Sequence, residues 1–202
     1  TGAPLPAWEP GAHIELELVG DGDVLLRQYS LCGDPAERGR WRIAVLREPA
    51  GRGGSAFIHD RLAVGDGIKV RALRNHFPFA PAPKCLFIAG GIGITPILPM
   101  LRRAQAAGLD WRLVYAARSH ARMAFLDELA GYPDARVRLH ADESDGPLDL
   151  PALLAGCDAD TAVYSCGPVG LLDALERRHR ADGGRPWALR IERFAGSAEA
   201  AA

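Results

Sequence analysis

Three short segments of this 202-residue chain combine residue types that suit the binding of phosphate groups and flat aromatic rings. The first is Arg27-Gln28-Tyr29-Ser30-Leu31, in which a cation and an aromatic ring stand two residues apart. The second is the glycine-rich run Ala89-Gly90-Gly91-Ile92-Gly93-Ile94-Thr95-Pro96-Ile97, and the third is Ser165-Cys166-Gly167-Pro168. Glycine lets a backbone approach a ligand closely, and a helix that follows such a turn offers unpaired N–H groups to phosphate. Together the segments predict a flavin site that meets a nicotinamide site.

The segment around Arg27 has the composition of a β-strand. Side chains alternate along a strand, so Arg27 and Tyr29 are expected on the same side. Arg27 can then bind a phosphate group while the Tyr29 ring covers a flavin ring. The Ser30 hydroxyl or N–H group can reach the flavin edge near N5. The alternative is that Tyr29 is an aromatic of a core strand and Arg27 its solvated neighbour.

A second segment, Arg52-Gly53-Gly54-Ser55, supports the same phosphate site. Two adjacent glycines precede a serine at the start of a helix predicted over 56–62, with Ser55 as its N-cap. This arrangement presents backbone N–H groups and the positive end of a helix dipole to an anion. A glycine-rich loop without a ligand is the alternative.

The turn Gly90-Gly91-Ile92-Gly93 follows a short apolar strand predicted over 85–89. It precedes a helix predicted over 95–107, with Thr95 at its start and Pro96 at its first position. The glycines and the helix start suit the pyrophosphate of a dinucleotide. The spacing G-G-x-G-x-T-P differs from G-x-G-x-x-G, so the ordinary dinucleotide fingerprint is absent.

The later turn, Cys166-Gly167-Pro168, ends a strand predicted over 162–165 and opens a helix predicted over 169–180. This places it at the carboxyl edge of a sheet, near the first glycine turn, where open α/β folds bind ligands. A buried thiol without a role in the site is the alternative for Cys166.

The pattern of the chain changes near residue 80. Before that point short β-forming runs alternate with turns, which predicts an antiparallel β-barrel. After it, apolar strands alternate with helices, which predicts a doubly wound parallel sheet. Three prolines in Phe77-Pro78-Phe79-Ala80-Pro81-Ala82-Pro83 disfavour both helix and central strand there. We therefore expect a flavin-binding domain over 1–80, a nucleotide-binding domain over 84–194 and a tail over 195–202.

The elements that must position the three segments follow from these patterns. The strands expected in the barrel are 12–18, 24–31, 41–47 and 67–73, and a hairpin turn is expected at Gly20-Asp21-Gly22-Asp23. The strands expected in the parallel sheet are 85–89, 112–117, 136–140, 162–165 and 188–191. The helices expected between them are 95–107, 124–129, 150–154 and 169–180.

The motifs R-Q-Y-S-L-C, I-A-V-L-R, G-R-G-G-S and G-G-x-G-x-T-P resemble those of the ferredoxin-NADP reductase superfamily. Within it, the chain resembles the phthalate dioxygenase reductase and vanillate demethylase reductase group. The resemblance implies a six-stranded type of flavin-binding barrel, whose first strand is not apparent here, followed by the nucleotide domain. That group uses FMN, with FAD as the alternative. The resemblance implies that the following residues line FMN: Arg27, Gln28, Tyr29, Ser30, Ala44, Val45, Leu46, Arg52, Gly53, Gly54 and Ser55.

The resemblance also implies roles at the nucleotide site. Gly91, Gly93, Thr95, Pro96, Gly167 and Pro168 would bind the nucleotide. Cys166 would lie beside the nicotinamide ring and flavin N5, and Phe194 would shield the flavin face, although Phe194 can also be a frayed apolar anchor. The residues expected to act in the reaction are Ser30, Cys166 and Phe194.

The choice between NADH and NADPH is expected to depend on Arg118-Ser119-His120-Ala121-Arg122, after the second parallel strand. Its two arginines, Arg118 and Arg122, could hold a 2′-phosphate, and that segment contains no acidic residue to receive a 2′-hydroxyl. The resemblance nevertheless favours NADH.

The function implied is that of a reductase that passes electrons from NADH through FMN to a [2Fe-2S] centre and a Rieske-type oxygenase. No C-x₄-C-x₂-C run is present, so that centre is expected beyond Ala202 or in a separate ferredoxin-type acceptor. One alternative is a FAD-containing reductase with another acceptor. Another is a nucleotide-binding electron-transfer subunit without hydride chemistry.

The composition of the chain limits the classes of partner and the cellular location that we expect. With 24 basic and 25 acidic residues, the net charge of -1 gives no field that favours nucleic acid. No apolar run is long enough to span a bilayer and no signal peptide opens the chain, so a cytoplasmic protein is expected. The four cysteines lack metal or disulfide spacing, so no metal site is expected. We expect a monomer.

Overall fold

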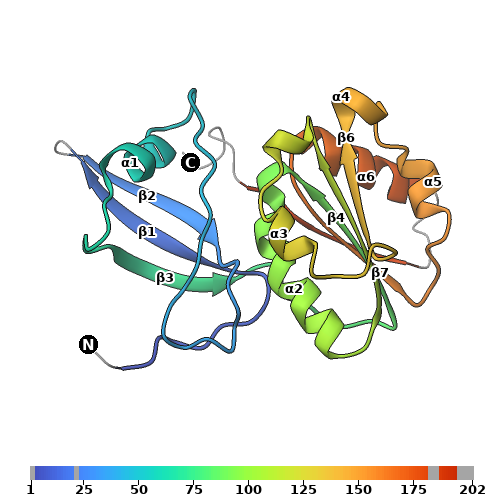
Figure 1. Ribbon diagram of the computed structural model, residues 1–202, viewed down its shortest axis with the longest axis horizontal. Helices are drawn as coiled ribbons and strands as arrows, with labels where there is room; N and C mark the ends of the chain where they lie inside the picture. Colours follow the sequence, from blue (N-terminus) through green and yellow to red (C-terminus); the bar gives the residue numbers. More distant parts are fainter. Residues whose placement is uncertain (1–2, 21–22, 182–186, 195–202) are drawn as a thin grey trace.

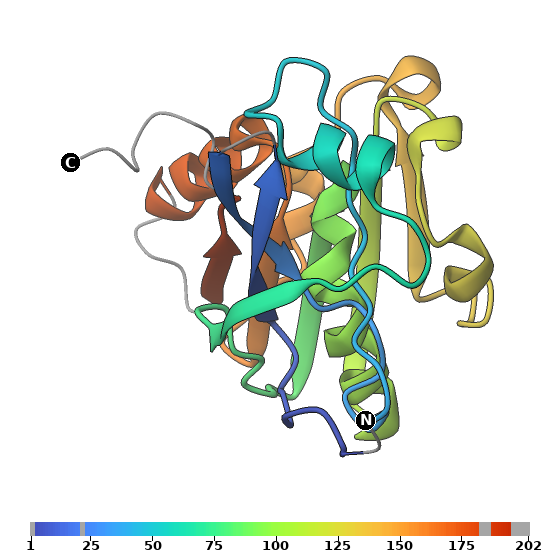
Figure 2. The same ribbon diagram turned by 90° about the vertical axis from the view of Figure 1, so that its left-hand side faces the viewer.

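The computed structural model describes residues 3–20, 23–181 and 187–194. Its helices and strands form two lobes that lie side by side, an antiparallel lobe and an α/β lobe (Figure 1). Figure 2 looks from the antiparallel lobe towards the α/β lobe behind it. The expected turn residues Asp21 and Gly22 and the expected tail over 195–202 lie outside the described residues.

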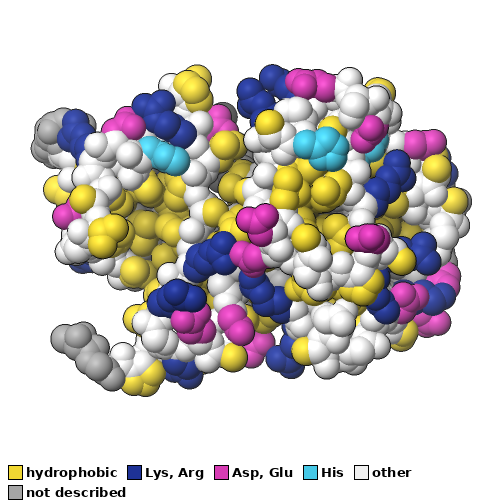
Figure 3. Space-filling model, in the orientation of Figure 1, with side chains coloured by type: hydrophobic (Ala, Val, Ile, Leu, Met, Phe, Trp, Pro, Cys, Tyr) yellow, Lys and Arg dark blue, Asp and Glu magenta, His cyan; other side chains and the backbone are white. Residues whose placement is uncertain are grey.

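The antiparallel lobe comprises β1 (Ala12–Gly20), β2 (Asp23–Ser30), α1 (Gly54–Arg61) and β3 (Lys69–Asn75). Its three strands pair antiparallel in the order β2-β1-β3. Strand β1 shows why this sheet forms: Ile14, Leu16 and Leu18 are buried on one face, while Glu17 on the other face binds Lys69 and Arg71 of β3. The inner face forms a core, and Figure 3 shows a hollow in this lobe that hydrophobic side chains line.

The prediction of a regular strand over 41–47 is wrong. Only Ile43 forms an isolated antiparallel bridge, to Leu31 just beyond β2. Past that point the backbone groups bind side chains instead of a neighbouring strand: the Val45 carbonyl contacts His59 Nε2, and the Glu48 N–H donates to Ser55 Oγ. The expected antiparallel lobe is confirmed, and three of its expected strands are present in the described residues.

The α/β lobe follows the expected alternation throughout. Its elements are β4 (Lys84–Gly90), η1 (Gly91–Gly93), α2 (Ile94–Ala106), β5 (Asp110–Ala117), η2 (His120–Arg122), α3 (Leu126–Leu129), β6 (Val137–Ala141), α4 (Asp142–Asp145), α5 (Leu150–Leu154), β7 (Thr161–Cys166), α6 (Val169–Ala181) and β8 (Ala188–Glu192). All strands are parallel, in the order β6-β5-β4-β7-β8, so the chain winds in both directions from β4. The expected doubly wound sheet is confirmed.

Strand β4 is buried on both faces because helices cover both. Cys85 and Phe87 belong to the core on the side of α2 and α3. Leu86 and Ile88 belong to the core on the side of α5 and α6. The near-continuous apolar run of β4 therefore fills two cores at once.

The segment that connects the two sheets is held against the α/β lobe by contacts between aromatic side chains. Phe77, which is 3% exposed, packs edge-on against Tyr164 of β7, and Phe79 contacts both Tyr164 and Phe87. The Tyr164 hydroxyl accepts from the Ala80 N–H at 2.9 Å and donates to the Ala80 carbonyl at 2.9 Å. The proline-rich segment is thus bound along its length to the α/β lobe. The expected division into domains at this segment stays a prediction.

Candidate functional site

The ends of three strands meet where the two lobes face each other. Ser30 is the last residue of β2, Cys166 is the last residue of β7, and Glu192 ends β8 beside Cys166 in the parallel register. Ser30 and Cys166 are buried, at 5% and 0% exposure. Ser30 donates a side-chain hydrogen bond to the Glu192 carboxyl. The structure thus brings the expected residues Ser30 and Cys166 together around an acidic group that the sequence patterns did not single out.

Glu192 is the unusual member of this group. Burial raises the pKa of its carboxyl to about 7, although the hydrogen bond from Ser30 acts in the opposite direction. Its Oε2 is buried and has no hydrogen-bond partner among the described residues. A buried carboxyl with a spare oxygen at the carboxyl edge of a parallel sheet can hold or release a proton near neutral pH.

Cys166 is a neutral thiol in this setting. Burial raises the pKa of its thiol strongly, and the nearby Glu192 carboxyl raises it further. A thiol of this kind is a poor nucleophile, because the reactive form of cysteine is the thiolate. Cys166 therefore contributes a small buried apolar side chain to the end of β7.

The two glycine turns touch each other, as their positions on neighbouring strands require. A Cβ on Gly93 would lie 2.2 Å from the Cys166 carbonyl oxygen and 2.6 Å from the Gly167 nitrogen. A Cβ on Gly167 would lie 2.8 Å from Gly90 Cα, and one on Gly90 would lie 2.5 Å from Pro168 Cδ. At Gly90, Gly93 and Gly167 the backbones leave no room for side chains, whereas Gly91 has open space around it and a positive φ of 52°.

The first turn differs from expectation in its details. Gly91–Gly93 is a short 3₁₀ turn that runs directly into α2, so the helix begins at Ile94 and Pro96 is its third residue, not its first. The Thr95 side chain is buried, and its hydroxyl donates to the Ile92 carbonyl at 3.0 Å. Thr95 therefore shapes the turn. In the first turn of α2 the Ile94 N–H donates to the Gly91 and Ile92 carbonyls, and Pro96 has no N–H to donate.

On the other side of the site, Arg27 lies in a cradle. Its guanidinium donates to the Arg52 carbonyl and, at 2.7 Å, to the Leu26 carbonyl. A Cβ on Gly54 would lie 2.5 Å from Arg27 Cγ, so the side chain lies directly on the glycine backbone. Gly53, at φ 78°, is in the left-handed region and precedes α1. The structure thus brings together Arg27, Arg52, Gly53 and Gly54.

The prediction that Ser55 is the N-cap of α1 is wrong. The N-cap is Gly53, and α1 has no side-chain cap. Ser55 lies inside the first helical turn, where its Oγ accepts the Glu48 N–H at 3.1 Å. The glycines alone allow the tight approach, and the serine ties the preceding loop to the helix.

The side chains of the R-Q-Y-S strand divide as alternation requires. Tyr29 is half-buried on the inner face with Arg27, and burial raises the pKa of its hydroxyl. Gln28 is exposed on the opposite face, with its Nε2 3.4 Å from Glu15 Oε2. The Gln28 side chain therefore points away from Arg27 and Tyr29, which leaves only its backbone for a ligand on that face.

The remaining expected residues lie around these groups. Ala44 packs against the core shared by the two lobes, Val45 is half-buried, and Leu46 is 51% exposed. Phe194 follows Glu192 by two residues and is 41% exposed, so its ring is available for contact.

Arg118 is exposed at the carboxyl end of β5, and an acidic helix lies beside it. The Arg118 carbonyl accepts the N–H of Glu143 in α4, whose four residues are Asp142, Glu143, Ser144 and Asp145. The sequence patterns located no acidic residue at this position, because the acidic residues of α4 follow β6, the next strand of the sheet. Parallel order brings them together, since the carboxyl ends of β5 and β6 are neighbours.

Two further observations limit the chemistry of the described residues. No group of three His, Cys, Asp or Glu residues among them is arranged to hold a metal ion. Of the helices in the described part of the chain, none has the length and apolar character that crossing a bilayer requires.

Comparison with known proteins gives related chains and structures. The chain is 47% identical over 174 residues to phenoxybenzoate dioxygenase subunit beta of Ectopseudomonas oleovorans, a match that covers 85% of this chain and 53% of that protein. It is 43% identical over 188 residues to vanillate O-demethylase oxidoreductase of Pseudomonas putida, covering 92% and 58%. No protein-family model matches the chain.

Among solved structures, phthalate dioxygenase reductase superposes with a TM-score of 0.85 at 37% identity, covering 99% of this chain and 62% of that one. That protein is described as a modular structure for electron transfer from pyridine nucleotides to [2Fe-2S]. The chain spans little more than half the length of the curated relatives named here.

Proposed function

The chain is a homologue of the phthalate dioxygenase reductase-type reductase subunits of oxygenase systems, and from this premise we propose that it is the flavin- and nucleotide-binding part of such a reductase. It takes electrons from NADH through FMN and delivers them to a [2Fe-2S] centre that serves a Rieske-type oxygenase. The observation that carries the proposal is the meeting of Ser30, Cys166 and Glu192 at the junction of the lobes.

The residues fit a flavin on observations of this structure. Arg27 rests on Gly54 and is held by the Arg52 carbonyl, which leaves a cation next to the start of α1 for a phosphate. Tyr29 supplies an aromatic surface from the same face of β2. When bound, the flavin accepts a hydride from nicotinamide and passes the electrons on singly.

The residues of the chain itself would position the two cofactors and exclude water from between them. The touching glycine turns would hold the pyrophosphate, and the nicotinamide end would then lie beside Cys166. Ser30 donates to the Glu192 carboxyl, which holds a proton at pH values below about 7, and this pair would lie at the flavin edge. Phe194, exposed just after β8, would cover the outer face of the ring system.

We favour NADH over NADPH because of the acidic helix beside Arg118. A 2′-phosphate bound to Arg118 would approach the carboxylates of α4, whereas a 2′-hydroxyl can donate to one. The R-G-G-S loop and the family resemblance favour FMN over FAD. All four cysteines are thiols, which agrees with a location in the reducing cytoplasm.

Absorbance spectroscopy tests the proposal directly. We expect the purified protein to show the visible bands of a flavin and to lose them on anaerobic addition of NADH, with slower bleaching by NADPH. Mass analysis of the released cofactor should give FMN. A colourless protein that does not take up added flavin, or a coloured one that neither nucleotide bleaches, would contradict the proposal.

Replacing Arg27 with alanine should weaken flavin retention by about 1.5 to 3 kcal/mol, the usual contribution of a hydrogen bond to a charged group. Titration of the flavin-free protein with FMN measures this. Arg71→Ala is the matched control, since Arg71 belongs to the same sheet but binds Glu17 on its outer face. Equal FMN affinity in both variants would remove Arg27 from the phosphate site.

A further inference from the structure

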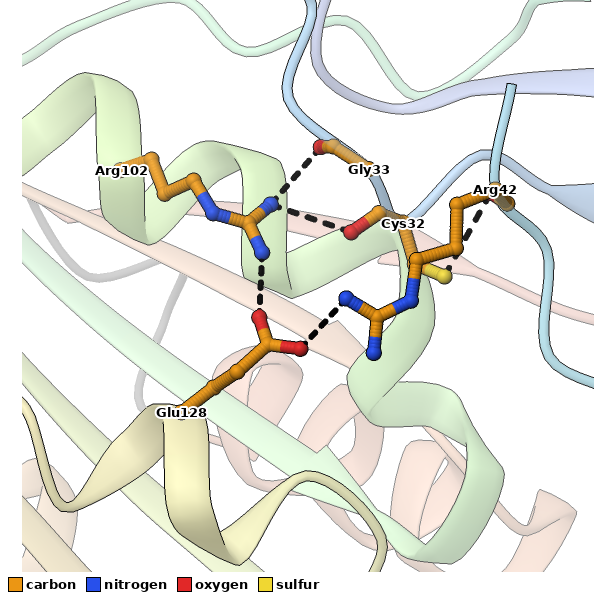
Figure 4. Close-up of polar contacts among 5 residues, drawn as sticks. All are labelled: Cys32, Gly33, Arg42, Arg102 and Glu128. Atoms are coloured by element: carbon orange, nitrogen blue, oxygen red, sulfur yellow. Dashed lines mark hydrogen bonds and ion pairs between the residues drawn. The ribbon is translucent and has the colours of Figure 1, made fainter. Parts of the chain in front are cut away.

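A cluster of charged side chains joins the two lobes away from the glycine turns (Figure 4). Arg102 of α2 donates from one guanidinium nitrogen to the carbonyls of Cys32 and Gly33, at 3.0 and 2.7 Å. Its other terminal nitrogen lies 2.5 Å from Glu128 Oε2 in α3. Arg102 thus binds the antiparallel lobe and its own lobe at the same time.

Glu128 extends the cluster back across the junction. Its second oxygen, Oε1, lies 2.5 Å from the guanidinium of Arg42, which belongs to the antiparallel lobe. The side chains of Arg102 and Glu128 are only 28% and 31% exposed. One carboxylate therefore holds two arginines, one from each lobe, in a partly buried position where the charges are screened less by water.

The start of α3 is strained in the conformation that presents this cluster. Phe125 has φ 64°, and it is the one residue other than glycine with a positive φ in the described chain. Its ring lies under Arg42, whose guanidinium carbon is 4.8 Å from the ring centroid. A bulky residue in the left-handed region is strained and persists only where surrounding contacts impose that conformation.

The contacts of Arg102 connect the two halves of the candidate site. Cys32 and Gly33 follow Ser30 by two and three residues, so they continue the strand that presents Tyr29 and Ser30. Helix α2 begins directly after the Gly91–Gly93 turn and carries Arg102 two turns further along. Helix α2 therefore begins at the Gly91–Gly93 turn and binds, through Arg102, the segment that directly follows β2.

We propose that Arg102 and Glu128 are positioning residues that set the distance between the flavin strand and the nucleotide turn. The proposal rests on the proposed function, since it concerns the geometry in which hydride passes between the two cofactors. Partly buried ion pairs add little stability over apolar contacts, and in some proteins they select one arrangement of the groups that they join. Both donor nitrogens of Arg102 are used on opposite sides of the junction, which suits that task.

The variants Arg102→Ala and Glu128→Gln test the proposal, with Arg103→Ala as the matched control. Arg103 is the next residue of α2 and is exposed. Stopped-flow reduction at saturating NADH should slow by about 10- to 100-fold in both test variants, the effect expected when reacting groups are misplaced by about 1 Å. Flavin content and the dissociation constant for NADH should change by less than about 3-fold, because the contacts to phosphate are untouched.

The conservative variant Arg102→Lys separates positioning from general stability. A lysine keeps the charge but lacks the planar guanidinium that binds the two carbonyls and Glu128 at the same time. The reduction rate of Arg102→Lys should therefore lie between those of wild type and Arg102→Ala. Hydrogen exchange gives a readout that needs no turnover. Peptides covering 31–34 and 124–130 should exchange faster in Arg102→Ala than in Arg103→Ala.

Two results would overturn the proposal. The first is an unchanged reduction rate per bound flavin in Arg102→Ala and Glu128→Gln. The second is unchanged hydrogen exchange at both segments, which would show that the cluster does not hold the lobes. If wild type is not bleached by NADH, the proposed function fails, and the hydrogen-exchange comparison still decides whether Arg102 fixes the junction.

Discussion

Replacing Gly93 with alanine is expected to raise the dissociation constant for NADH by about 100-fold, equivalent to about 2.7 kcal/mol. The added Cβ would lie 2.2 and 2.4 Å from the carbonyl oxygen and carbon of Cys166, and 2.6 Å from the Gly167 nitrogen. All three are backbone atoms, so no side chain can rotate away and the two turns must separate. Separation would move the start of α2, where we propose that the pyrophosphate binds.

The same substitution should lower the free energy of unfolding by about 1 to 3 kcal/mol, as overpacking usually does. Isothermal titration with NADH and urea unfolding measure the two effects. Gly170→Ala is the matched control, since a Cβ there meets nothing within 4 Å and the position lies in α6. If Gly93→Ala bound NADH as tightly as Gly170→Ala, the turn would not be the pyrophosphate site.

Replacing Glu192 with glutamine is expected to remove a pH dependence of stability of about 2 to 3 kcal/mol, from a shift of the pKa from 4.5 to about 7. The sign follows from proton binding. Between pH 4.5 and 7 the folded protein keeps this proton while the unfolded chain releases it. The contribution of Glu192 to stability is therefore largest below pH 4.5 and falls as pH rises to about 7.

Urea unfolding of wild type and Glu192→Gln at pH 5 and pH 8 checks this. The variant should lose less stability than wild type over that interval, because glutamine cannot ionise and can still accept from Ser30. Glu9→Gln, at an exposed position in the antiparallel lobe, is the control and should follow wild type. Parallel pH profiles for wild type and Glu192→Gln would show that the carboxyl is ionised in the folded protein.

The α/β lobe was predictable from sequence because its strands and helices differ in period. The apolar run in β4 and the helical pattern of α2 each indicate one type of element, and the structure places both within about two residues of the expected bounds. The segment over 41–47 has the same β-forming composition as a strand, but its carbonyl and N–H groups find partners in His59 and Ser55. Composition cannot reveal such competition, since it depends on where α1 packs.

The candidate site was predictable where a motif implies a backbone conformation. Touching glycines at Gly93 and Gly167 follow from the turns that they form. Glu192 could not be singled out in the same way, because a lone acidic residue at the end of a strand is ordinary. Its importance arises from burial and from the register that sets it beside Cys166. The one available indication was its place at the carboxyl edge of the sheet.

The aromatic contacts of the proline-rich segment have a practical consequence for dissecting the gene. Tyr164 holds Ala80 by two hydrogen bonds, and Phe77 and Phe79 pack against it. A cut at this segment would separate the rings of Phe77 and Phe79 from Tyr164. Apolar rings in both fragments would then be exposed to water. Separate expression of the halves should therefore give aggregation-prone products, and a split version would need its two pieces produced together in one host.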